Sequence, residues 1–540
     1  MAVRSTLSLS LTAIVVAVPV GLPVLVVCLS LLNPSMNSMA HLASTVLPDY
    51  LINTVMLMVL VGIMAAVIGV GTAWLTATAD FPGSRWLAPA LVLPLACPGY
   101  VLGYVYADLL EFSGPVQSEL RGLTGWAYGD YFFPPIRSLP GAAVVLAIGL
   151  FPYVYLLART AFRQQSVSLY DAAGVLGAGR VGIFTRVALP AARPAIAGGL
   201  ALVLMETVAD YGVVQHYGVP TFTTGIFRTW LAMGDKPAAL NLAAALFGIV
   251  LLLVLLEQTA RRGRQTNPLG GHGGRTRRLG GVGGVLATLV CALPVVVGFV
   301  IPMSRLAWLS LTVGDPLPAA AFMGFVGNTV QVAALVAALC AASALGLVYL
   351  ERLGQSWPIR LGVRAATLGY ALPGTVLGIG MLVPLAAFDR WLATTAEGVG
   401  WQTGLLFTGT TGALALALIA RFMTVAFNST AGGMAQIHPQ LDAAARSLGA
   451  SPLGTLRRVH VPLLRPAVVG GMLLVFIDVM KELPATLILR PFNFETLATR
   501  VFRLASDERL AEASTAAIAI VLVGLIPTVM LMRYGDKRPT

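Results

Sequence analysis

The chain has 540 residues and a formal net charge of +12, and 57% of its residues are hydrophobic while only 11% are charged. Its mean hydropathy is +0.83. Soluble domains of this length do not have such a composition, so it excludes a soluble globular enzyme or binding module and favours a membrane protein.

Twelve apolar runs recur along the chain, each close to the ~20 residues that a helix needs to cross a bilayer. In the first half they cover roughly residues 12–32, 52–76, 87–109, 141–160, 195–215 and 239–256. In the second half they cover roughly residues 282–303, 327–350, 366–387, 405–427, 467–489 and 514–532. Because backbone groups in lipid must satisfy their own hydrogen bonds, the runs predict an all-α membrane protein with about 12 transmembrane helices.

The first run follows Arg4 and could be a signal peptide, but no persuasive cleavage site follows it. Removing this run would also leave the first half one helix short of the second, so we expect Met1 to lie in the cytoplasm. With that start, about 24 Lys and Arg residues fall on the cytoplasmic side and about nine outside, as the positive-inside rule predicts. These charges lie in short loops and form no continuous basic face, so the net charge does not indicate nucleic-acid binding.

One polar pattern occurs twice in this apolar chain, at residues 171–200 and 443–472, with a constant offset of 272. The matched positions are Gly177 and Gly449, Arg186 and Arg458, Pro190 and Pro462, Arg193 and Arg465, Pro194 and Pro466, and Gly198 and Gly199 with Gly470 and Gly471. Matches at an offset of 275 begin at Asn53 with Asn328 and at Pro98 with Pro373. Toward the end of each half, residues 222–228 align with residues 494–500, again at 272. A duplication of this length indicates that one six-helix unit occurs twice.

The stretch from Arg261 to Gly281 is basic and rich in glycine, so we interpret it as a flexible cytoplasmic linker. The predicted domains are a first six-helix repeat at residues 1–260, the linker at 261–281, and a second six-helix repeat at 282–540. An even number of helices gives both repeats the same orientation. Two parallel six-helix repeats predict a pseudo-twofold axis along the membrane normal and a central pathway between the halves.

Each repeated polar segment lies between the fourth and fifth predicted helices of its half, on the cytoplasmic side. Alanine favours a short helix there, and Gly177 and Gly449 permit a turn that other residues adopt only at a cost. Pro190 and Pro462 mark where a new helix can begin. The alternative is that each segment is only a solvated loop. Two copies of the pattern in register disfavour this alternative and predict a rigid, exposed helix between two spans.

At these residues the chain resembles the permease subunits of binding-protein-dependent ABC importers, whose cytoplasmic loop carries a motif that starts with EAA, continues to a glycine and ends with I-x-L-P. The first copy matches it with Asp171, Ala172, Ala173, Gly177 and Pro190, and the second with Asp442, Ala443, Ala444, Gly449 and Pro462. In the second copy the acid is displaced to Asp442 and Ala443 occupies the usual Glu position, which puts a salt bridge from that position in doubt. The resemblance implies that both loops form coupling helices that dock into a groove of an ATPase subunit.

The chain has no G-x-x-x-x-G-K-[ST] loop and no catalytic constellation, so we assign ATP hydrolysis to a separate subunit. We expect no catalytic residue, no metal site and no cofactor on this chain. The resemblance implies two copies of an ABC ATPase and a substrate-binding protein as partners, and a multi-pass location in the bacterial inner membrane with both termini cytoplasmic. The cysteines lie in or beside apolar runs, where we expect packing roles: Cys28, Cys97, Cys291 and Cys340.

Ionisable residues inside membrane spans are costly and usually face a cavity or a partner. The fifth helix of the first half carries Glu206 and Asp210, and its counterpart in the second half carries Asp478, Lys481 and Glu482. The alignment places Glu206 on Asp478 and Asp210 on Glu482. These residues either line a pathway that attracts a cation or form salt bridges between helices, for instance through Lys481, and both interpretations stay open.

Residues 205–230 and 480–502 are similar to the ferric-iron branch of the same permease family, and the resemblance covers nearly the whole chain. Carboxylate and phenolate oxygens, such as those of Tyr211 and Tyr217, would suit a hard trivalent ion, although Tyr at a membrane boundary is also a common interfacial anchor. The leading hypothesis is the membrane subunit of an ATP-driven importer of ferric iron that works by alternating access. The alternatives are the same architecture importing thiamine, phosphonate or polyamine, and an ion-driven secondary transporter.

Overall fold

The structure is a computed structural model that describes residues 18, 21–32, 41–42, 44–127, 129–261, 277–354, 357–398, 400 and 404–535. Within these residues, nine helices are long and apolar enough to cross a membrane, and the bent pair Ser84–Ala96 and Gly99–Thr124 would make a tenth. Two shorter apolar helices, Gly21–Ser30 and Leu510–Leu525, fall on the first and last predicted runs. Each predicted run therefore coincides with a helical segment, which confirms the all-α membrane fold. Most of the predicted linker, residues 262–276, lies outside the described residues.

The chain packs into two compact units whose boundaries differ from those of the sequence repeats. Unit 1 comprises Met1–Ala40, Ile226–Phe247 and Leu317–Arg500, and unit 2 comprises His41–Gly225, Gly248–Pro316 and Val501–Thr540. Each unit thus holds the middle of one repeat together with segments from near both ends of the other. The repeats at residues 1–260 and 282–540 stay a prediction about duplicated sequence, while packing follows a different division of the chain.

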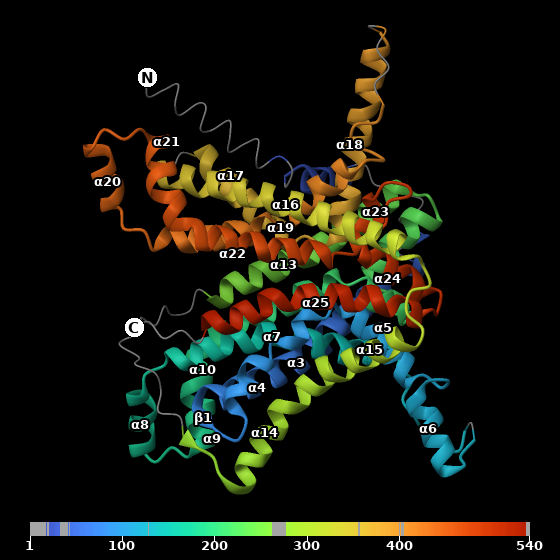
Figure 1. Ribbon diagram of the computed structural model, residues 1–540, viewed down its shortest axis with the longest axis vertical. Coiled ribbons are helices and arrows are strands. Elements are labelled where there is room, and N and C mark those ends of the chain that lie inside the picture. Colours follow the sequence, from blue (N-terminus) through green and yellow to red (C-terminus); the bar gives the residue numbers. More distant parts are fainter. Residues whose placement is uncertain are drawn as a thin grey trace. The chain divides into compact units, whose positions relative to one another are not determined.

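Unit 2 is built around α3, α7 and α10, which pack against one another (Figure 1). Its elements are α3 (Leu47–Thr78), β1 (Ala79–Asp80), α4 (Ser84–Ala90), η1 (Leu93–Ala96), α5 (Gly99–Leu110), α6 (Pro115–Thr124), α7 (Leu139–Gln164), α8 (Val167–Val175), α9 (Arg180–Ile183), η2 (Phe184–Ala188), α10 (Leu189–Ala209), α11 (Gly212–His216), β2 (Arg277–Arg278), α14 (Gly281–Val295), η4 (Val296–Val300), α15 (Ile301–Thr312) and α25 (Leu510–Gly535). The two-residue strands β1 and β2 pair in parallel, so the end of the predicted linker is held beside the end of α3.

Unit 1 is built in the same way around α16, α19 and α22. Its elements are η3 (Arg228–Ala232), α16 (Ala319–Leu353), α17 (Trp357–Leu368), η5 (Gly369–Ala371), α18 (Gly374–Glu397), α19 (Thr411–Ala435), α20 (Gln440–Ser447), α21 (Pro452–Thr455), η6 (Leu456–His460), α22 (Val461–Met480) and α23 (Pro484–Leu489). The helices α12 (Phe222–Phe227), α13 (Lys236–Arg261) and α24 (Leu497–Ser506) continue from one unit into the other.

The matched Asn-Thr pairs have the same structural task in both units. In unit 2, the Asn53 amide donates to the Pro220 carbonyl at 3.0 Å, and the Phe222 N–H donates to the Thr54 hydroxyl at 3.3 Å. Both bonds fix the chain just where α12 begins. They satisfy backbone groups that the chain leaves free before a helix starts.

In unit 1, the Asn328 amide donates to the Glu495 carbonyl at 3.1 Å, and the Leu497 N–H donates to the Thr329 hydroxyl at 2.9 Å. These partners follow those of unit 2 at an offset of 275, so the predicted alignment of residues 222–228 with 494–500 at 272 is wrong by three residues. Both stretches contain similar Phe, Thr and Arg residues, and only the hydrogen bonds distinguish the two registers. The three extra residues lie in the connection between α23 and α24.

Pro190 and Pro462 are the second residues of α10 and α22, as the sequence predicts, but each α-helix continues a longer span instead of starting after a break. The spans run over Val181–Ala209 and Pro452–Met480, and each proline follows a π-helical segment, η2 or η6. Pro302 follows η4 in the same way. Proline lacks an N–H and crowds the carbonyl four residues before it, and a wider π turn accommodates both defects.

The second glycine of each matched Gly-Gly pair lies where two helices cross closely. A Cβ added at Gly199 would lie 2.8 Å from the Cα of Val154, and one added at Gly471 would lie 2.9 Å from the Cβ of Ser429. A Cβ at Gly470 would meet nothing within 4 Å. Small residues at such crossings let the backbones of membrane helices approach each other.

We predict that Gly471→Ala lowers the free energy of unfolding by about 1–3 kcal/mol, because the added methyl group overpacks the crossing of α22 and α19. Thermal unfolding of the solubilised protein measures the effect. Gly470→Ala, one residue away on the same helix, is the matched control and should leave the unfolding temperature unchanged or higher. Equal losses in the two variants would contradict the assignment of the crossing to Gly471.

Candidate functional site

The two repeated polar segments fold into the same short motif, once in each unit. In unit 2, α8 ends at a left-handed glycine, Gly177, with φ of +81°, and in unit 1, α20 ends at Gly449 with φ of +76°. The N–H of Ala178 donates to the Ala173 carbonyl at 3.0 Å, and the equivalent bond joins residues 450 and 445 at 3.0 Å. This closure of a helix end requires a left-handed residue, so the predicted glycine turns are confirmed.

The residue before each glycine is a leucine with little contact to the rest of the chain. Leu176 and Leu448 occupy matched positions, and each is 86% exposed. Beside Leu176, Val175 is 88% exposed. An added Cβ at Gly177 or Gly449 would meet nothing within 4 Å, so the turns themselves are open to a partner. Exposed apolar side chains that recur at equivalent positions outside the spans mark an interaction surface.

Aromatic packing holds the first of these helices against its unit. The indole of Trp74, on α3, lies 5.9 Å from the ring of Tyr170 and 5.1 Å from that of Phe184, measured between centroids. The hydroxyl of Tyr170 donates to the Gln165 amide oxygen, and the Gln165 amide donates to the Ala188 carbonyl at 3.1 Å. Ring contacts and side-chain hydrogen bonds therefore hold α8 against the end of α3 and against η2, just before α10.

Charged groups hold the second helix instead. Arg352 Nε lies 2.9 Å from Asp442 Oδ2, and His460 Nε2 lies 2.6 Å from Asp442 Oδ1. Arg352 also donates to the Ile437 carbonyl at 2.9 Å, and Tyr349 packs on the His460 ring. Burial by itself would raise the pKa of Asp442, but the hydrogen bond and charge of Arg352, together with His460, lower it below its usual range.

The two anchors share one matched position but differ in chemistry. Asp442 matches Tyr170 at an offset of 272, whereas Arg352 matches Ala77 at 275 and Trp74 matches Tyr349. Ala443, at the usual Glu position, has no charge for a salt bridge, and the displaced Asp442 forms ion pairs with Arg352 and His460 instead. Sequence reasoning missed Arg352 and His460 as partners, since they lie at the ends of two other helices, at separations of 90 and 18 residues.

The acids at the end of each fifth helix accept hydrogen bonds from the backbone. In unit 2, Asp210 Oδ1 accepts from the N–H groups of Val213 and Val214, both at 3.1 Å, at the start of α11. In unit 1, Glu482 accepts from the N–H groups of Ala485 and Thr486, both at 3.0 Å, at the start of α23. A helix that breaks inside the membrane exposes such N–H groups, and the carboxylates satisfy them.

The remaining charges of this region differ between the units. Lys481 forms an ion pair with Asp478 at 2.9 Å, and Arg421 lies 3.3 Å from Glu482, so salt bridges take up both acids of unit 1. No cationic partner is found for Glu206 or Asp210 among the described residues. Arg421 was not predicted, because a single arginine within an apolar run carries no motif. The cation pathway through these residues stays a prediction.

The two candidate tyrosines of unit 2 have structural partners. The Tyr217 hydroxyl donates to the Gly103 carbonyl at 3.0 Å, and the Tyr211 ring packs 5.7 Å from that of Phe502.

The glycines of the matched Pro-Gly pairs lie close to the capping acids, Asp210 and Glu482. A Cβ at Gly374 would lie 2.6 Å from Glu482 Oε1, and one at Gly99 would lie 3.9 Å from Asp210 Oδ2.

Comparison with known proteins agrees with this architecture. Residues 343–540 match the family described as "Binding-protein-dependent transport system inner membrane component". The chain is 26% identical over 546 residues to the Fe(3+)-transport system permease protein FbpB 2 of Haemophilus influenzae, and the match covers 98% of each chain. It is 30% identical over 206 residues to a probable molybdenum ABC transporter permease protein of Haloferax volcanii, covering 38% of this chain and 72% of that protein.

Helices long and apolar enough to cross a membrane, with two short exposed helices outside the spans, fit a membrane transport subunit. The chain belongs to the family of binding-protein-dependent transport system inner membrane components, the permeases of ABC transporters. It is therefore a multi-pass membrane subunit of the inner membrane.

We predict that Asp442→Asn loosens α20 and speeds its backbone hydrogen exchange, because hydrogen bonds to a charged group contribute about 1–3 kcal/mol. In the wild type the lowered pKa keeps the carboxylate ionised, so the protection of α20 should persist as pH falls to ~4 and be lost only below the usual Asp range. Asp171→Asn, in the first copy, is the control and should leave the exchange of α8 unchanged. Unaltered exchange of α20 in Asp442→Asn would refute the anchoring role.

Proposed function

We propose that this chain is the membrane-spanning permease subunit of an ATP-driven importer of ferric iron, delivered by an extracytoplasmic substrate-binding protein. The observation that supports ferric iron as the substrate is the match to the ferric permease of Haemophilus influenzae, which extends over 98% of both chains. A molybdenum permease of Escherichia coli matches only 35% of this chain, and a putative 2-aminoethylphosphonate permease of Salmonella paratyphi A only 31%. Those matches support the shared permease core, while the full-length match supports iron.

Two copies of an ATPase subunit are the proposed partners of α8 and α20. Each helix presents an exposed leucine beside an open glycine turn, and each is tied to the membrane helices of its own unit by Trp74 or by Asp442. Movement imposed on such a helix by a partner is transmitted directly to α3 and α10 or to α16 and α22. ATP binds and reacts on the partner, and the two units supply the pathway. Membership in a binding-protein-dependent family does not support the ion-driven secondary transporter.

The substitutions Gly177→Asp and Gly449→Asp together should abolish ATP-dependent uptake of ferric iron into proteoliposomes. A side chain at a left-handed position is strained, and the added charge disturbs the docking surface. The assay contains the permease, its ATPase, and iron-loaded binding protein outside the vesicles. Gly122→Asp, on exposed α6, is the control with the same side chain and should transport normally. Normal uptake by the double variant would contradict the proposed role of these turns in coupling. ATP-dependent uptake of molybdate or a phosphonate in place of iron would contradict the assignment of ferric iron as the substrate.

The proposed orientation places both termini, α8 and α20 in the cytoplasm. In a Cys28→Ser background, the introduced Leu448→Cys should react with a membrane-impermeant maleimide only after the cells are permeabilised, while Leu123→Cys, on α6, should react in intact cells. Leu123 is 84% exposed, and the three other native cysteines are buried. The opposite labelling pattern would invert the topology.

A further inference from the structure

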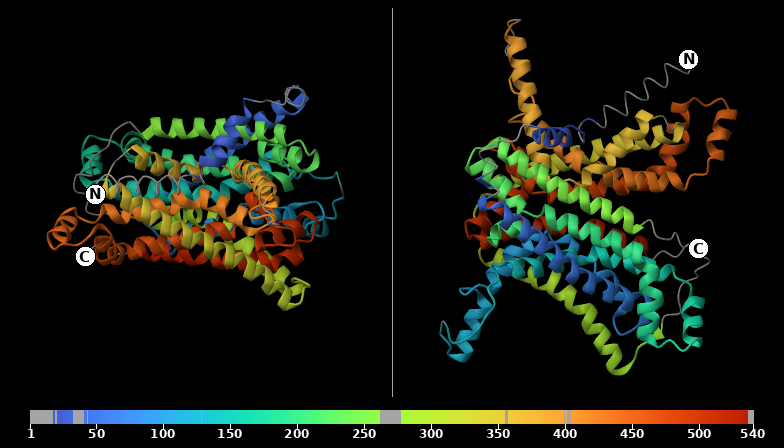
Figure 2. Two further views of the ribbon diagram at one scale, coloured as in Figure 1. Left: turned by 90° about the horizontal axis from the view of Figure 1, so that it is seen from above. Right: turned by 180° about the vertical axis from the view of Figure 1, so that it is seen from behind.

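The last part of α18, residues 388–397, forms an arm that leaves the other helices of unit 1. Asp389 is the last buried residue of this helix, whereas most of the earlier residues of α18 pack in the core of the unit. Figures 1 and 2 show the arm turning away from the direction of α16 and α19 and projecting beyond them, at the end of the unit opposite α20. A helix that runs across the end of membrane spans is positioned to lie along a membrane surface.

Hydrogen bonds from the loop before α19 fix the depth of this arm. The carboxylate of Asp389 accepts from the N–H groups of Leu406, Phe407 and Thr408 at 3.3, 3.2 and 2.7 Å, and from the Thr408 hydroxyl at 2.6 Å. The α19 span begins shortly afterwards, at Thr411. Because Asp389 is tied to the residues that precede this span, the arm is held at the level where α19 enters the membrane.

The arm has one apolar and one charged face. The helical period places Phe388, Trp391 and Leu392 on one face, and Arg390 and Glu397 on the opposite face. The Trp391 side chain is 59% exposed, and Phe388 is exposed beside it, with 5.8 Å between the two ring centroids. The apolar face of the arm is therefore not covered by the rest of the unit.

The loop that Asp389 holds adds two leucines to this apolar face. Leu405 and Leu406 are both exposed, and the ring of Phe407 packs 5.8 Å from that of Phe388. Together Phe388, Trp391, Leu405 and Leu406 form an apolar patch. The patch lies between two predicted membrane runs, of which one ends at residue 387 and the next begins at residue 405. Aromatic residues concentrate at such boundaries between hydrocarbon and water.

The polar groups of the arm do not require a polar partner on the apolar side. The hydroxyls of Thr394 and Thr395 donate to the Trp391 carbonyl at 2.9 and 2.8 Å, so the helix itself satisfies them. The exposed charges, Arg390 and Glu397, are opposite in sign. They give the arm little net attraction for a charged partner, so burial of the apolar patch is the favoured interaction.

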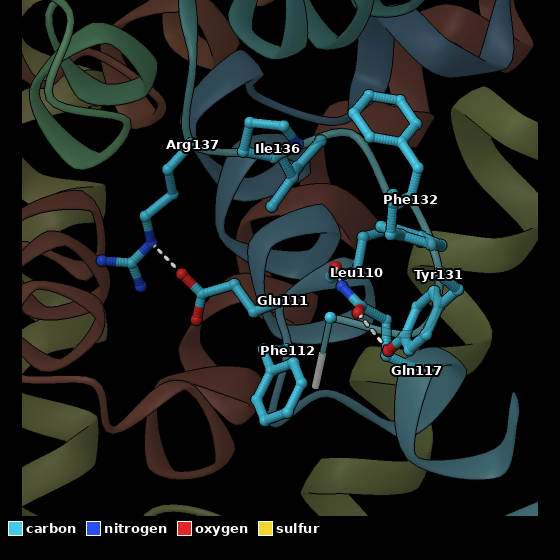
Figure 3. Close-up of a pocket in the computed structure, with 11 residues that line it drawn as sticks. Leu110, Glu111, Phe112, Gln117, Tyr131, Phe132, Ile136 and Arg137 are labelled. Carbon is cyan, nitrogen blue, oxygen red and sulfur yellow. Dashed lines mark hydrogen bonds and ion pairs between the residues drawn. The ribbon is translucent and has the colours of Figure 1, made fainter. Parts of the chain in front are cut away.

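The matched region of unit 2 folds differently. At the offset of 275, Asp389 matches Gly114, where the chain turns after α5. A Cβ at Gly114 would lie 2.8 Å from the Leu109 carbonyl oxygen, so glycine permits the turn. Beyond it the chain borders a cavity of about 420 Å³, where Gln117 accepts from the Tyr131 hydroxyl at 2.7 Å (Figure 3). Unit 2 thus turns its chain back at this point, whereas α18 of unit 1 continues outward as one helix.

We propose that the arm of α18 and residues 404–407 form an anchor on the lipid surface, on the side of the membrane opposite α20. The apolar patch lies among the lipid headgroups and the first methylene groups of the acyl chains, while Arg390 and Glu397 face water. Helices that lie in a membrane interface divide their apolar and charged faces in this way. The anchor involves neither the ATPase nor the transported substrate, so it goes beyond the proposed function.

Collision measurements on spin labels test the anchor in the full-length permease, in nanodiscs of phosphatidylethanolamine and phosphatidylglycerol. The background is Cys28→Ser, because the three other native cysteines are buried. Labels at Trp391→Cys or Leu406→Cys, in the patch, should collide with oxygen, which concentrates in lipid, several times more often than with a water-soluble nickel chelate. A label at Thr394→Cys, on the polar side of the same helix, is the matched control and should show the opposite preference. All three positions carry exposed or self-satisfied side chains, so these variants should fold.

Two results would overturn the anchor. One is equal access of the nickel chelate to the patch labels and to the Thr394→Cys label, which would place the whole arm in water. The other is a patch that the chelate reaches in the permease alone and that becomes shielded only when the substrate-binding protein is added, which would make it a protein docking surface. Asp389→Asn tests the hydrogen bonds that hold the loop: it should raise the mobility of the Leu406→Cys label and leave that of Thr394→Cys unchanged. Unchanged mobility at both positions would contradict the role of Asp389 in holding the patch together.

Discussion

The hydrocarbon core of a membrane offers no hydrogen-bond partner to a polypeptide backbone, and the main features of this protein follow from that constraint. Continuous spans satisfy it by helix formation. Where the fifth helix of each repeat breaks, Asp210 and Glu482 accept the N–H groups that the break sets free. Where proline removes an N–H, a π turn precedes it. Asp210 and Glu482 thus have a structural role before any transport role is considered.

The two matched segments place these features at similar positions while their chemistry differs. Both exposed helices end in a left-handed glycine beside an exposed leucine, and the residues that anchor them, Tyr170 and Asp442, lie at matched positions. One anchor is aromatic and the other is ionic, so we expect pH and charge substitutions to act on the second more than on the first. The capping acids diverge as well, because only Glu482 has an arginine partner among the described residues. A permease chain that holds two repeats can give them different properties, which two identical single-repeat subunits cannot do.

The predicted site residues divide according to how local their interactions are. The glycine turns at 177 and 449 follow from a pattern within one segment, so sequence reasoning predicted them correctly. The partners of Asp442 come from the ends of α16 and α22, and the partner of Glu482 comes from α19. Such pairs depend on how helices pack, and no spacing rule along the chain indicates them. The register of α24 against α16 likewise depended on two hydrogen bonds between distant segments.

By itself, the sequence determined the class of protein, the positions of the membrane helices, the repeat and the turned segments outside the spans, because these follow from hydropathy, periodicity and backbone preferences of nearby residues. Only the tertiary structure decided which parts of the two repeats pack into each unit, which charges are paired, and that Asp389 holds the loop before α19 beside the arm of α18. The physical reason is that burial and pairing are properties of surfaces brought together by folding. Residues far apart in the chain acquire their electrostatic surroundings only when their helices are packed.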